Sequence, residues 1–350
     1  MSWLSGWSYR KSHVINYAAG AGTLYQKMIT AHYGSGTDSD DDVYLNSHCR
    51  TDFGDIRFTD DDGVTLLDYW MEKKVDSDYA VFWVEVADDL STVDQTIYIY
   101  YDASTQTTTS NGADTFLLFD DFNRPDNATV GGEWTEDEDA GVGALNISLN
   151  LLKIVQYQHN FCHIEKASPA LSSLALHGKI RTGTNSGFSW YPAICFYWGV
   201  DDWVQLGWMD NVNWRGQYNK ASTIAGVNVA GGAVDTWYFY RIKLGSGTVY
   251  LDYSTDGLSW TTLTSITRPT SWAGNPALVI VGKGDSDAPD YPNPDLDNSY
   301  SSTGSEGTHY ADDVFVRKFV DPEPAHGSWG SEETGVVKKS IGDGLTFVLV

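Results

Sequence analysis

The chain has 350 residues, of which 41% are hydrophobic and 14% aromatic, so it is long enough for two domains and can bury a core in each. Aspartate and glutamate number 47 against 22 lysines and arginines, a formal net charge of −25. Because such a field repels a phosphate backbone, we expect no nucleic-acid partner, whereas cations, cationic surfaces and neutral glycans stay open. Solubility in high salt would account for the same acidic composition.

The chain begins "MSWLSGWSYRK", which lacks the apolar core of a secretory signal. No apolar run approaches the ~18 residues of a membrane span, so we expect no membrane insertion. Helical periodicity is weak. It is strongest over residues 163–177, where Pro169 restricts any helix to a short one.

Strand-like runs occur instead along the whole chain, separated by clusters of Gly, Asn, Asp and Ser. The clearest cover residues 79–86, 96–101, 193–198, 237–244, 248–254 and 277–282. The chain is therefore predicted to be all-β.

The clearest domain boundary is the polar, Thr-rich segment 102–114. We predict one β-sandwich over residues 1–110 and a second over 114–320. Residues 321–350 are predicted to form a linker, up to 335, followed by a C-terminal strand. Because an exposed apolar strand invites aggregation, we expect it to pair with its own sheet or with a neighbouring subunit, and we expect a homo-oligomer. The long segment 284–309 is predicted to be either functional or disordered.

Three consecutive aspartates, Asp60 to Asp62, precede Gly63 between two strand-like runs. An EF-hand loop alternates its acids, and these do not alternate. Asp-Gly is a strong hairpin signal, so we predict a turn here in preference to a cation site.

The first domain carries "DIRFTDDDG" (55–63), "YWME" (69–72), "AVFWVEV" (80–86) and "TIYIYYD" (96–102). This order resembles an uncharacterised domain family of archaeal and bacterial surface proteins and some viral proteins. Asp102 stands where that family usually has glycine. The resemblance covers residues 7–122 and implies a location on a virion, cell or extracellular surface, but no activity.

The second domain begins "FDDFNRPDNATVGGEW" (119–134) and closes "HYADDVFVRKF" (309–319), and it resembles a concanavalin A-like lectin/glucanase jelly roll. The resemblance implies that its first and last strands lie side by side, and some members bind structural Ca²⁺ there. The candidate ligands are Asp120, Asp121, Asp312 and Asp313. The alternative is that these aspartates only end strands facing solvent.

Catalytic motifs are missing from the sequence. No Glu-x-Asp-x-x-Glu pair occurs, and there is no Gly-x-Ser-x-Gly, His-Glu-x-x-His or phosphate loop. The acidic run 136–139 is consecutive and is predicted to be a loop with diverging side chains. "STDGLSW" (254–260) resembles one Asp-box turn but occurs once, so we interpret it as a hairpin. We predict no catalytic residues and a protein that is not an enzyme.

Residues 188–218 are rich in aromatic side chains. Alternation places some of them in a core, but a sandwich buries one face of each sheet, so several should be exposed. The candidates for binding a glycan or partner are Trp190, Trp203, Trp208, Trp214 and Tyr218. Cys49, Cys162 and Cys195 show no metal spacing, and we expect buried thiols.

These features favour a non-enzymatic structural or attachment protein of a virion (tail or capsid surface) or a cell surface, whose partners are glycans or other subunits. One alternative is a glycoside hydrolase with an unrecognised pair of acids. The other is a structural subunit that assembles itself through its C-terminal strand.

Overall fold

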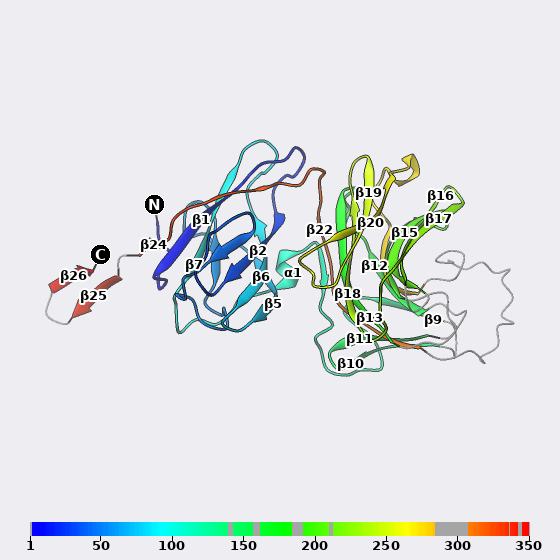
Figure 1. Ribbon diagram of the computed structural model, residues 1–350, viewed down its shortest axis with the longest axis horizontal. Coiled ribbons are helices and arrows are strands. Elements are labelled where there is room, and N and C mark those ends of the chain that lie inside the picture. The colour runs from blue at the N-terminus through cyan, green and yellow to red at the C-terminus, as the bar shows by residue number, and fades with distance from the viewer. Residues whose placement is uncertain are drawn as a thin grey trace. The chain divides into compact units, whose positions relative to one another are not determined.

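The computed structural model describes residues 2–138, 143–156, 162–183, 192–209, 213–283, 307–335, 337–341 and 345–349. Its regular structure is almost entirely β, apart from helix α1 (Gly112–Thr115) and the 3₁₀ turn η1 (Thr270–Trp272), so the predicted all-β fold is confirmed. Neither of these described helices is long and apolar enough to cross a membrane. The chain forms two compact units, which Figure 1 shows in ribbon form. Unit 1 comprises Met1–Phe116 and Pro322–Val350, and unit 2 comprises Leu117–Asp321.

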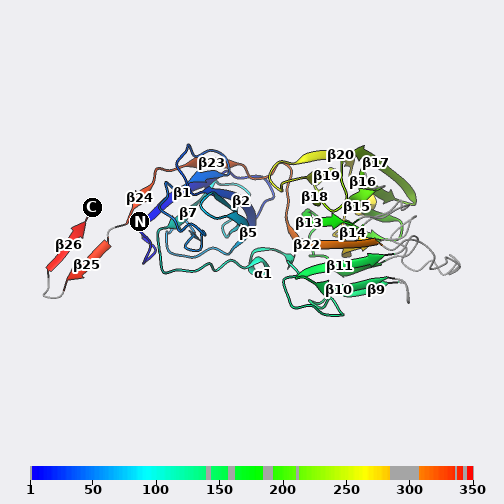
Figure 2. The ribbon, with the colours of Figure 1, turned by 60° about the horizontal axis from the view of Figure 1, so that its bottom comes forward.

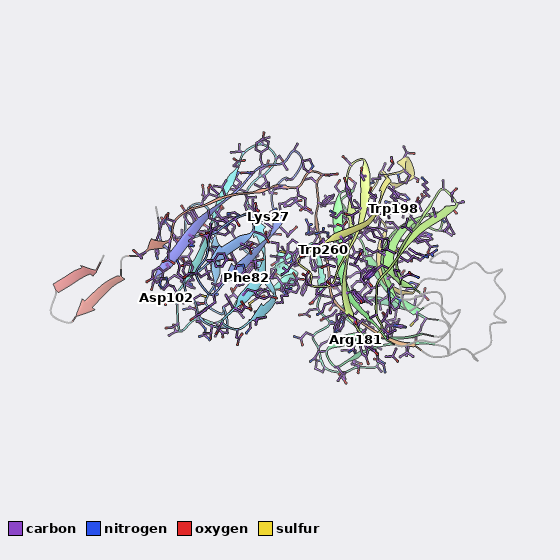
Figure 3. The ribbon with its side chains drawn as sticks, viewed as in Figure 1. Lys27, Phe82, Asp102, Arg181, Trp198 and Trp260 are labelled. Atoms are coloured by element: carbon purple, nitrogen blue, oxygen red, sulfur yellow. The ribbon has the colours of Figure 1, made fainter. Side chains whose placement is uncertain are left out.

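Unit 1 is a sandwich of two sheets. The first has the order β23 (His326–Trp329), β1 (Tyr9–Ile15), β7 (Gln95–Tyr101), β4 (Arg57–Thr59), with β24 (Glu333–Thr334) also on β1. The second has the order β3 (Asp42–Tyr44), β2 (Tyr25–His32), β6 (Tyr79–Val86), β5 (Tyr69–Val75). Phe58 of the first sheet meets Phe82 of the second edge to face, with ring centroids 5.5 Å apart. Phe82 is labelled in Figure 3. Both rings are fully buried, so they lie in the core between the sheets.

The Asp-Ile-Arg-Phe stretch of unit 1 is a structural motif. The buried Asp55 carboxylate accepts hydrogen bonds from the backbone N–H groups of Arg50 (3.0 Å), Asp102 (2.8 Å) and Ala103 (3.1 Å). The buried Arg57 guanidinium donates to the carbonyls of residues 56 and 107, both at 2.6 Å. These two side chains therefore satisfy backbone groups of separate loops, which a buried loop requires. Asp102 has φ 67°, which explains why glycine suits this position.

The predicted linker is wrong, because residues 322–335 belong to unit 1. In this segment, hereafter the strap, β23 and β24 both pair antiparallel with β1, with Trp329 opposite His13 and Thr334 opposite Tyr9. The strap thus covers an edge of β1 that residues 1–116 leave open. Its polar, Gly-rich composition hid this role, since the partner strand lies more than 300 positions away in the sequence. The unit boundary falls at Phe116, close to the predicted segment.

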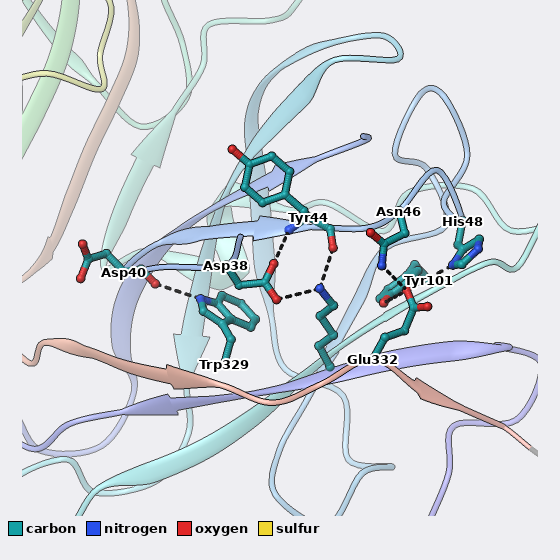
Figure 4. A network of polar contacts seen from close by, with 9 residues as sticks. Asp38, Asp40, Tyr44, Asn46, His48, Tyr101, Trp329 and Glu332 are labelled. Atoms are coloured by element: carbon teal, nitrogen blue, oxygen red, sulfur yellow. Dashed lines mark hydrogen bonds and ion pairs between the residues drawn. The ribbon is translucent and has the colours of Figure 1, made fainter. Parts of the chain in front are cut away.

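A polar network holds the strap in place (Figure 4). Oε2 of Glu332 accepts hydrogen bonds from the Tyr101 hydroxyl (2.7 Å) and the Asn46 amide (3.3 Å), and lies 3.1 Å from Nδ1 of His48. Burial by itself would raise the pKa of Glu332, but these hydrogen bonds outweigh burial and lower it. The Glu332 carboxylate is therefore ionised when the strap is in place.

The buried His13 and the partly buried His326 join the strap to β1. Nε2 of His13 lies 2.8 Å from Nδ1 of His326, and the Trp329 ring stacks on His13 with centroids 3.8 Å apart. Burial, together with the nearby Lys27 ammonium, lowers the pKa of His13 to about 3 and that of His326 to about 2. Both imidazoles are therefore neutral in the folded protein at neutral pH.

Unit 2 is a sandwich of two larger antiparallel sheets (Figure 2). The eight-stranded sheet has the order β10 (Ala144–Ser148), β11 (Leu151–Gln156), β22 (Gly307–Lys318), β13 (Leu174–Thr182), β18 (Trp237–Leu244), β19 (Thr248–Ser254), β20 (Thr261–Thr267), with β8 (Leu118–Asp120) also on β22. The seven-stranded sheet has the order β17 (Thr223–Ala230), β16 (Asn213–Lys220), β15 (Asp202–Met209), β14 (Ala193–Gly199), β21 (Leu278–Lys283), β12 (Cys162–Ala167), β9 (Thr135–Glu138). One apolar core lies between them. Because β8 pairs with β22, the predicted adjacency of the first and last strands is confirmed.

The two predicted turns are present. After β4, the Asp62 carboxylate accepts hydrogen bonds from the N–H groups of Val64 and Thr65, both at 2.8 Å. The pairing that closes this turn is a single bridge, Thr59 to Leu66. The Asp-Gly at 256–257 connects the paired strands β19 and β20, as the hairpin interpretation requires. Residues 163–177 contain no helix and contribute instead to β12 and β13.

The predictions for the tail and the cysteines can also be compared with the structure. Residues 337–341 (β25, Val337–Ile341) and 345–349 (β26, Leu345–Leu349) pair with each other as a two-stranded sheet. The three cysteines are buried and free, which confirms the expected thiols. Most of the segment 284–309, namely 284–306, lies outside the described residues.

The histidine pair predicts an acid-labile unit 1. Below the usual pKa of 6.5 the unfolded chain takes up protons that the folded imidazoles cannot, so the free energy of unfolding should fall between pH 6.5 and 3. Each histidine should contribute about 1.4 kcal/mol per pH unit in this window. In urea unfolding at pH 7, 6 and 5, the free energy of unfolding of His326→Gln should fall less steeply with pH than that of the parent. An unchanged slope in His326→Gln would contradict the assignment.

Candidate functional site

The seven-stranded sheet has one face toward the core and one face turned away from it. The second face carries polar side chains. Along β12, Cys162 and Ile164 point into the core, so His163 and Glu165 point to the other side. The register then places neighbours beside them. His163 lies opposite Asp137 on β9, and Glu165 lies opposite Ile280 on β21. We call this side of the sheet the polar face.

The middle of the polar face has an apolar floor. Cys195, Tyr197, Trp203 and Ile280 form a buried cluster that is separate from the main core. Trp203 is only 1% exposed although it lies outside the space between the two sheets. The centre of the polar face is thus shielded from solvent, and burial raises the pKa of the Cys195 thiol, which keeps it protonated.

Beside this floor the polar face carries amide and guanidinium groups. Gln205 on β15 donates to Gln217 on β16 at 2.9 Å. The Asn219 amide donates to the carbonyl of residue 200 at 3.2 Å, and Arg215 donates to the Asn228 side chain at 3.1 Å. Gln217 is 3% exposed and Asn219 is 4% exposed. Buried amides are costly unless they are hydrogen-bonded, and Gln217 and Asn219 each have such a bond within the protein.

The other end of the polar face is acidic. Nε2 of the buried His163 lies 3.8 Å from Oδ2 of Asp137 and 3.8 Å from Oε2 of Glu165. The prediction of a loop over residues 136–139 is wrong for Glu136 to Glu138, because β9 runs to Glu138 and residues 139–142 lie outside the described residues. The predicted divergence does hold within the strand. Asp137 joins the polar face, whereas Glu136 faces the other side and accepts from the backbone of Val130 at 2.6 Å.

Sequence analysis missed this acidic end. His163 and Glu165 are two positions apart, a spacing that puts both on one side of a strand. The weak helical periodicity of residues 163–177 obscures this spacing in the sequence. The contribution of Asp137 could not be read from the sequence, since it depends on the pairing of β9 with β12.

The predicted aromatic surface is not formed. Trp203 lies on the polar face, whereas Trp208, Trp214 and Tyr218 point into the core side of the same sheet. The expected exposure is wrong for all three described tryptophans, which are buried. Trp214 stacks on Tyr253 at 4.1 Å, so its area contributes to packing between the sheets. Trp190 lies outside the described residues.

Asp120, the first predicted calcium ligand, is occupied by protein donors. It forms two hydrogen bonds with the Arg124 guanidinium, at 2.7 and 3.1 Å, and accepts from the Trp134 indole at 2.7 Å. Asp121, next in the chain, accepts from the backbone N–H of Asn123 at 3.1 Å.

Asp312 and Asp313, on the partner strand, already share a cation. Both carboxylates contact Nζ of Lys179, at 3.0 and 3.4 Å. These consecutive residues reach one ammonium because a bulge with φ 49° at Asp313 interrupts the alternation. Among the residues that the structure describes, no group of three or more His, Cys, Asp or Glu side chains is arranged to hold a metal ion. The four aspartates therefore do not fit a calcium site.

Comparison with protein families supports the first resemblance. Residues 52–137 match the family described as "Domain of unknown function (DUF2341)". The chain therefore contains a DUF2341 domain, and the match begins in unit 1 and runs past Leu117 into the first residues of unit 2. A search of curated proteins found no match.

Solved structures similar to this chain include sugar-active and sugar-binding proteins. The GH43 protein BlXynB from Bacillus licheniformis aligns with 73% of this chain and 46% of its own length, at 11% identity and a TM-score of 0.44. The catalytic domain of an endo-1,3-β-glucanase (laminarinase) from Thermotoga petrophila aligns with 58% of this chain and 97% of its own, at 10% identity and a TM-score of 0.41. Botulinum neurotoxin type C aligns with 53% of this chain and 42% of its own, at 11% identity and a TM-score of 0.35. The chain thus spans less than half of the Bacillus protein, and we take neither activity nor ligand from these matches.

The Lys179 contacts predict that unit 2 does not depend on calcium. Treatment with EDTA and then excess calcium should leave its melting temperature unchanged, because an ammonium already neutralises the aspartates. Lys179→Met should lower the free energy of unfolding by about 1–3 kcal/mol, since it leaves two shielded carboxylates without a cation. The matched change Lys220→Met, at the partly exposed end of β16, should cost less than about 0.5 kcal/mol. Differential scanning calorimetry measures all of these, and a melting temperature that EDTA lowers and calcium restores would contradict the prediction.

Proposed function

We propose that unit 2 binds a neutral glycan on the polar face and that the chain is a non-enzymatic attachment protein of a virion or cell surface. The observation that carries this proposal is the set of hydrogen-bonding amide and guanidinium groups on this face, of which Gln205 and Arg215 are partly exposed and Asn228 is exposed. These groups lie on a sheet face that the hydrophobic core does not need.

The chemistry of this face suits an uncharged sugar. A side-chain amide offers both a donor and an acceptor, which matches a hydroxyl that does both. A ligand held by amides requires no charge, and this agrees with a protein whose net charge of −25 repels anions over most of its surface.

The surface location rests on unit 1. The DUF2341 match adds no activity, and the motif residues Asp55 and Arg57 are committed to backbone hydrogen bonds. Unit 1 is therefore proposed as the part that joins the chain to other subunits, with unit 2 inserted between its two segments as the part that binds.

Glycoside hydrolysis is the second candidate, favoured by one observation. Asp137 and Glu165 both lie 3.8 Å from the same nitrogen of His163. Two neighbouring carboxyl groups are what a glycosidase uses as acid and as nucleophile or base. A histidine between them would hold both in place.

The proposal is tested by titrating the full chain with neutral oligosaccharides, such as β-glucan, xylan and galactan hexasaccharides, in a calorimeter. Gln217→Ala should weaken binding about 5–100-fold, which corresponds to one lost hydrogen-bonded group of about 1–3 kcal/mol. Gln95→Ala, an exposed glutamine of unit 1, is the matched control and should bind like the parent.

Reducing-sugar release is measured on the same samples. Binding without release supports the attachment role. Release that Glu165→Gln abolishes while binding persists would assign the hydrolase instead. Identical affinity in Gln217→Ala and the parent would remove the polar face from consideration.

A further inference from the structure

A second row of polar side chains crosses the eight-stranded sheet. The strand register aligns one residue from each of five neighbouring strands, β10, β11, β22, β13 and β18. In order across the sheet they are Asn146, Lys153, Tyr310, Arg181 and Trp237, hereafter the cationic row.

The cationic row faces away from the core of unit 2. Its residues alternate along their strands with core residues, such as Leu152 on β11, Ile180 on β13 and Tyr238 on β18. The members of the row are partly exposed. They therefore lie on the outward side of this sheet, whereas the polar face lies on the outward side of the other sheet.

Arg181, labelled in Figure 3, lies at the centre of the aromatic contacts. Its guanidinium carbon is 4.6 Å from the centroid of the Tyr310 ring and 5.5 Å from that of Trp237. Two aromatic faces hold the cation in place without neutralising it. Its Nε atom is buried and has no hydrogen-bond partner in the described part of the chain.

The other cations of this sheet face contrast with the row. Lys179 pairs with two aspartates, and Arg241 and Lys243 both pair with Asp252. By comparison, neither Lys153 nor Arg181 forms an ion pair with any acid among the described residues. The chain has 47 acidic residues, yet these two cations of one sheet face form no ion pair among the described residues. Such cations favour the binding of an external anion.

We propose that the cationic row binds an acidic glycan, with sugar carboxylates on Arg181 and Lys153 and a sugar ring on Trp237. Arg181 and Lys153 are two strands apart, about 10 Å, a span that reaches between carboxylates of one extended polyuronate chain. The guanidinium is suited to a carboxylate because its planar fork donates two parallel hydrogen bonds. The buried Oδ1 of Asn146, which has no partner in the described residues, would accept from a sugar hydroxyl at the other end of the row.

This site goes beyond the proposed function, because it lies on the opposite sheet and takes a charged ligand. It would give the chain a second contact with an envelope or matrix polysaccharide. Its affinity should fall as salt rises, unlike that of a neutral sugar on the polar face.

Calorimetry of the full chain with an oligogalacturonate hexamer tests the proposal, and the fully methyl-esterified hexamer serves as the uncharged control. The acid form should bind at low salt and the ester should not. Arg181→Gln should weaken binding at least about tenfold, and Lys153→Gln should weaken it less, since a guanidinium makes the stronger carboxylate contact. Lys220→Gln removes the same charge from the end of β16 in the other sheet and should leave the affinity within about twofold of the parent.

Other outcomes would overturn the assignment. Equal binding of acid and ester would show that charge is not recognised. Unchanged affinity in Arg181→Gln, or a loss in Gln217→Ala alone, would place the acidic glycan elsewhere. Tighter binding of a sulfated heparin tetrasaccharide than of the uronate would replace carboxylate with sulfate as the ligand group.

Two controls complete the test. Arg181→Gln should also bind neutral glycans like the parent, and this separates the site from the polar face. Arg181→Lys, which keeps the charge, should retain part of the affinity and shows that folding is not the cause.

Discussion

Two sheets that share one apolar core leave every strand of unit 2 with a second side turned outward, and the chemistry of this unit follows from that constraint. Alternation sends Phe196, Val204 and Leu206 inward, and it sends Tyr197, Trp203 and Gln205 to the polar face. The same constraint lines up the cationic row on the other sheet. Neither surface is a loop feature, so strand register holds the positions of the groups that we propose to bind sugars.

The two outward faces differ in how their charges are balanced. On the polar face, carboxylates, a histidine and amides lie together, and Gln205 and Gln217 satisfy each other. On the opposite sheet, Lys179 is neutralised by its aspartates, whereas Arg181 contacts the Tyr310 and Trp237 rings and forms no ion pair among the described residues. A cation in an ion pair is already neutralised by a carboxylate of the protein. A cation that packs on aromatic rings keeps its net charge, which a ligand can neutralise. This difference separates Lys179, which has a structural role, from Arg181, for which we propose a role in ligand binding.

Unit 1 shows how polar groups can be entirely structural. Asp55 and Arg57 are the most recognisable residues of the DUF2341 region, and both are committed to backbone groups of neighbouring loops. The strap adds a second set of such contacts through Glu332 and the two neutral histidines. Because the strap follows unit 2 in the chain, the first sandwich is complete only after the second has been synthesised. Folding of unit 1 is therefore expected to finish late.

The sequence by itself determined the all-β fold, the approximate boundary near residue 116, the turns at Asp62 and Asp256 and the adjacency of the first and last strands of unit 2. These depend on local signals: alternation, Asp-Gly pairs and polar breaks that neighbouring residues carry themselves. Only the tertiary structure decided that residues 322–335 complete unit 1, that Trp208 and Trp214 are core residues and that Asp312 is paired with Lys179. It also brought Asp137 to His163, and Lys153, Arg181 and Trp237 into one row. Each of these depends on which strand lies beside which. Pairing between distant strands is set by the burial of whole sheet faces, and no short stretch of residues records it.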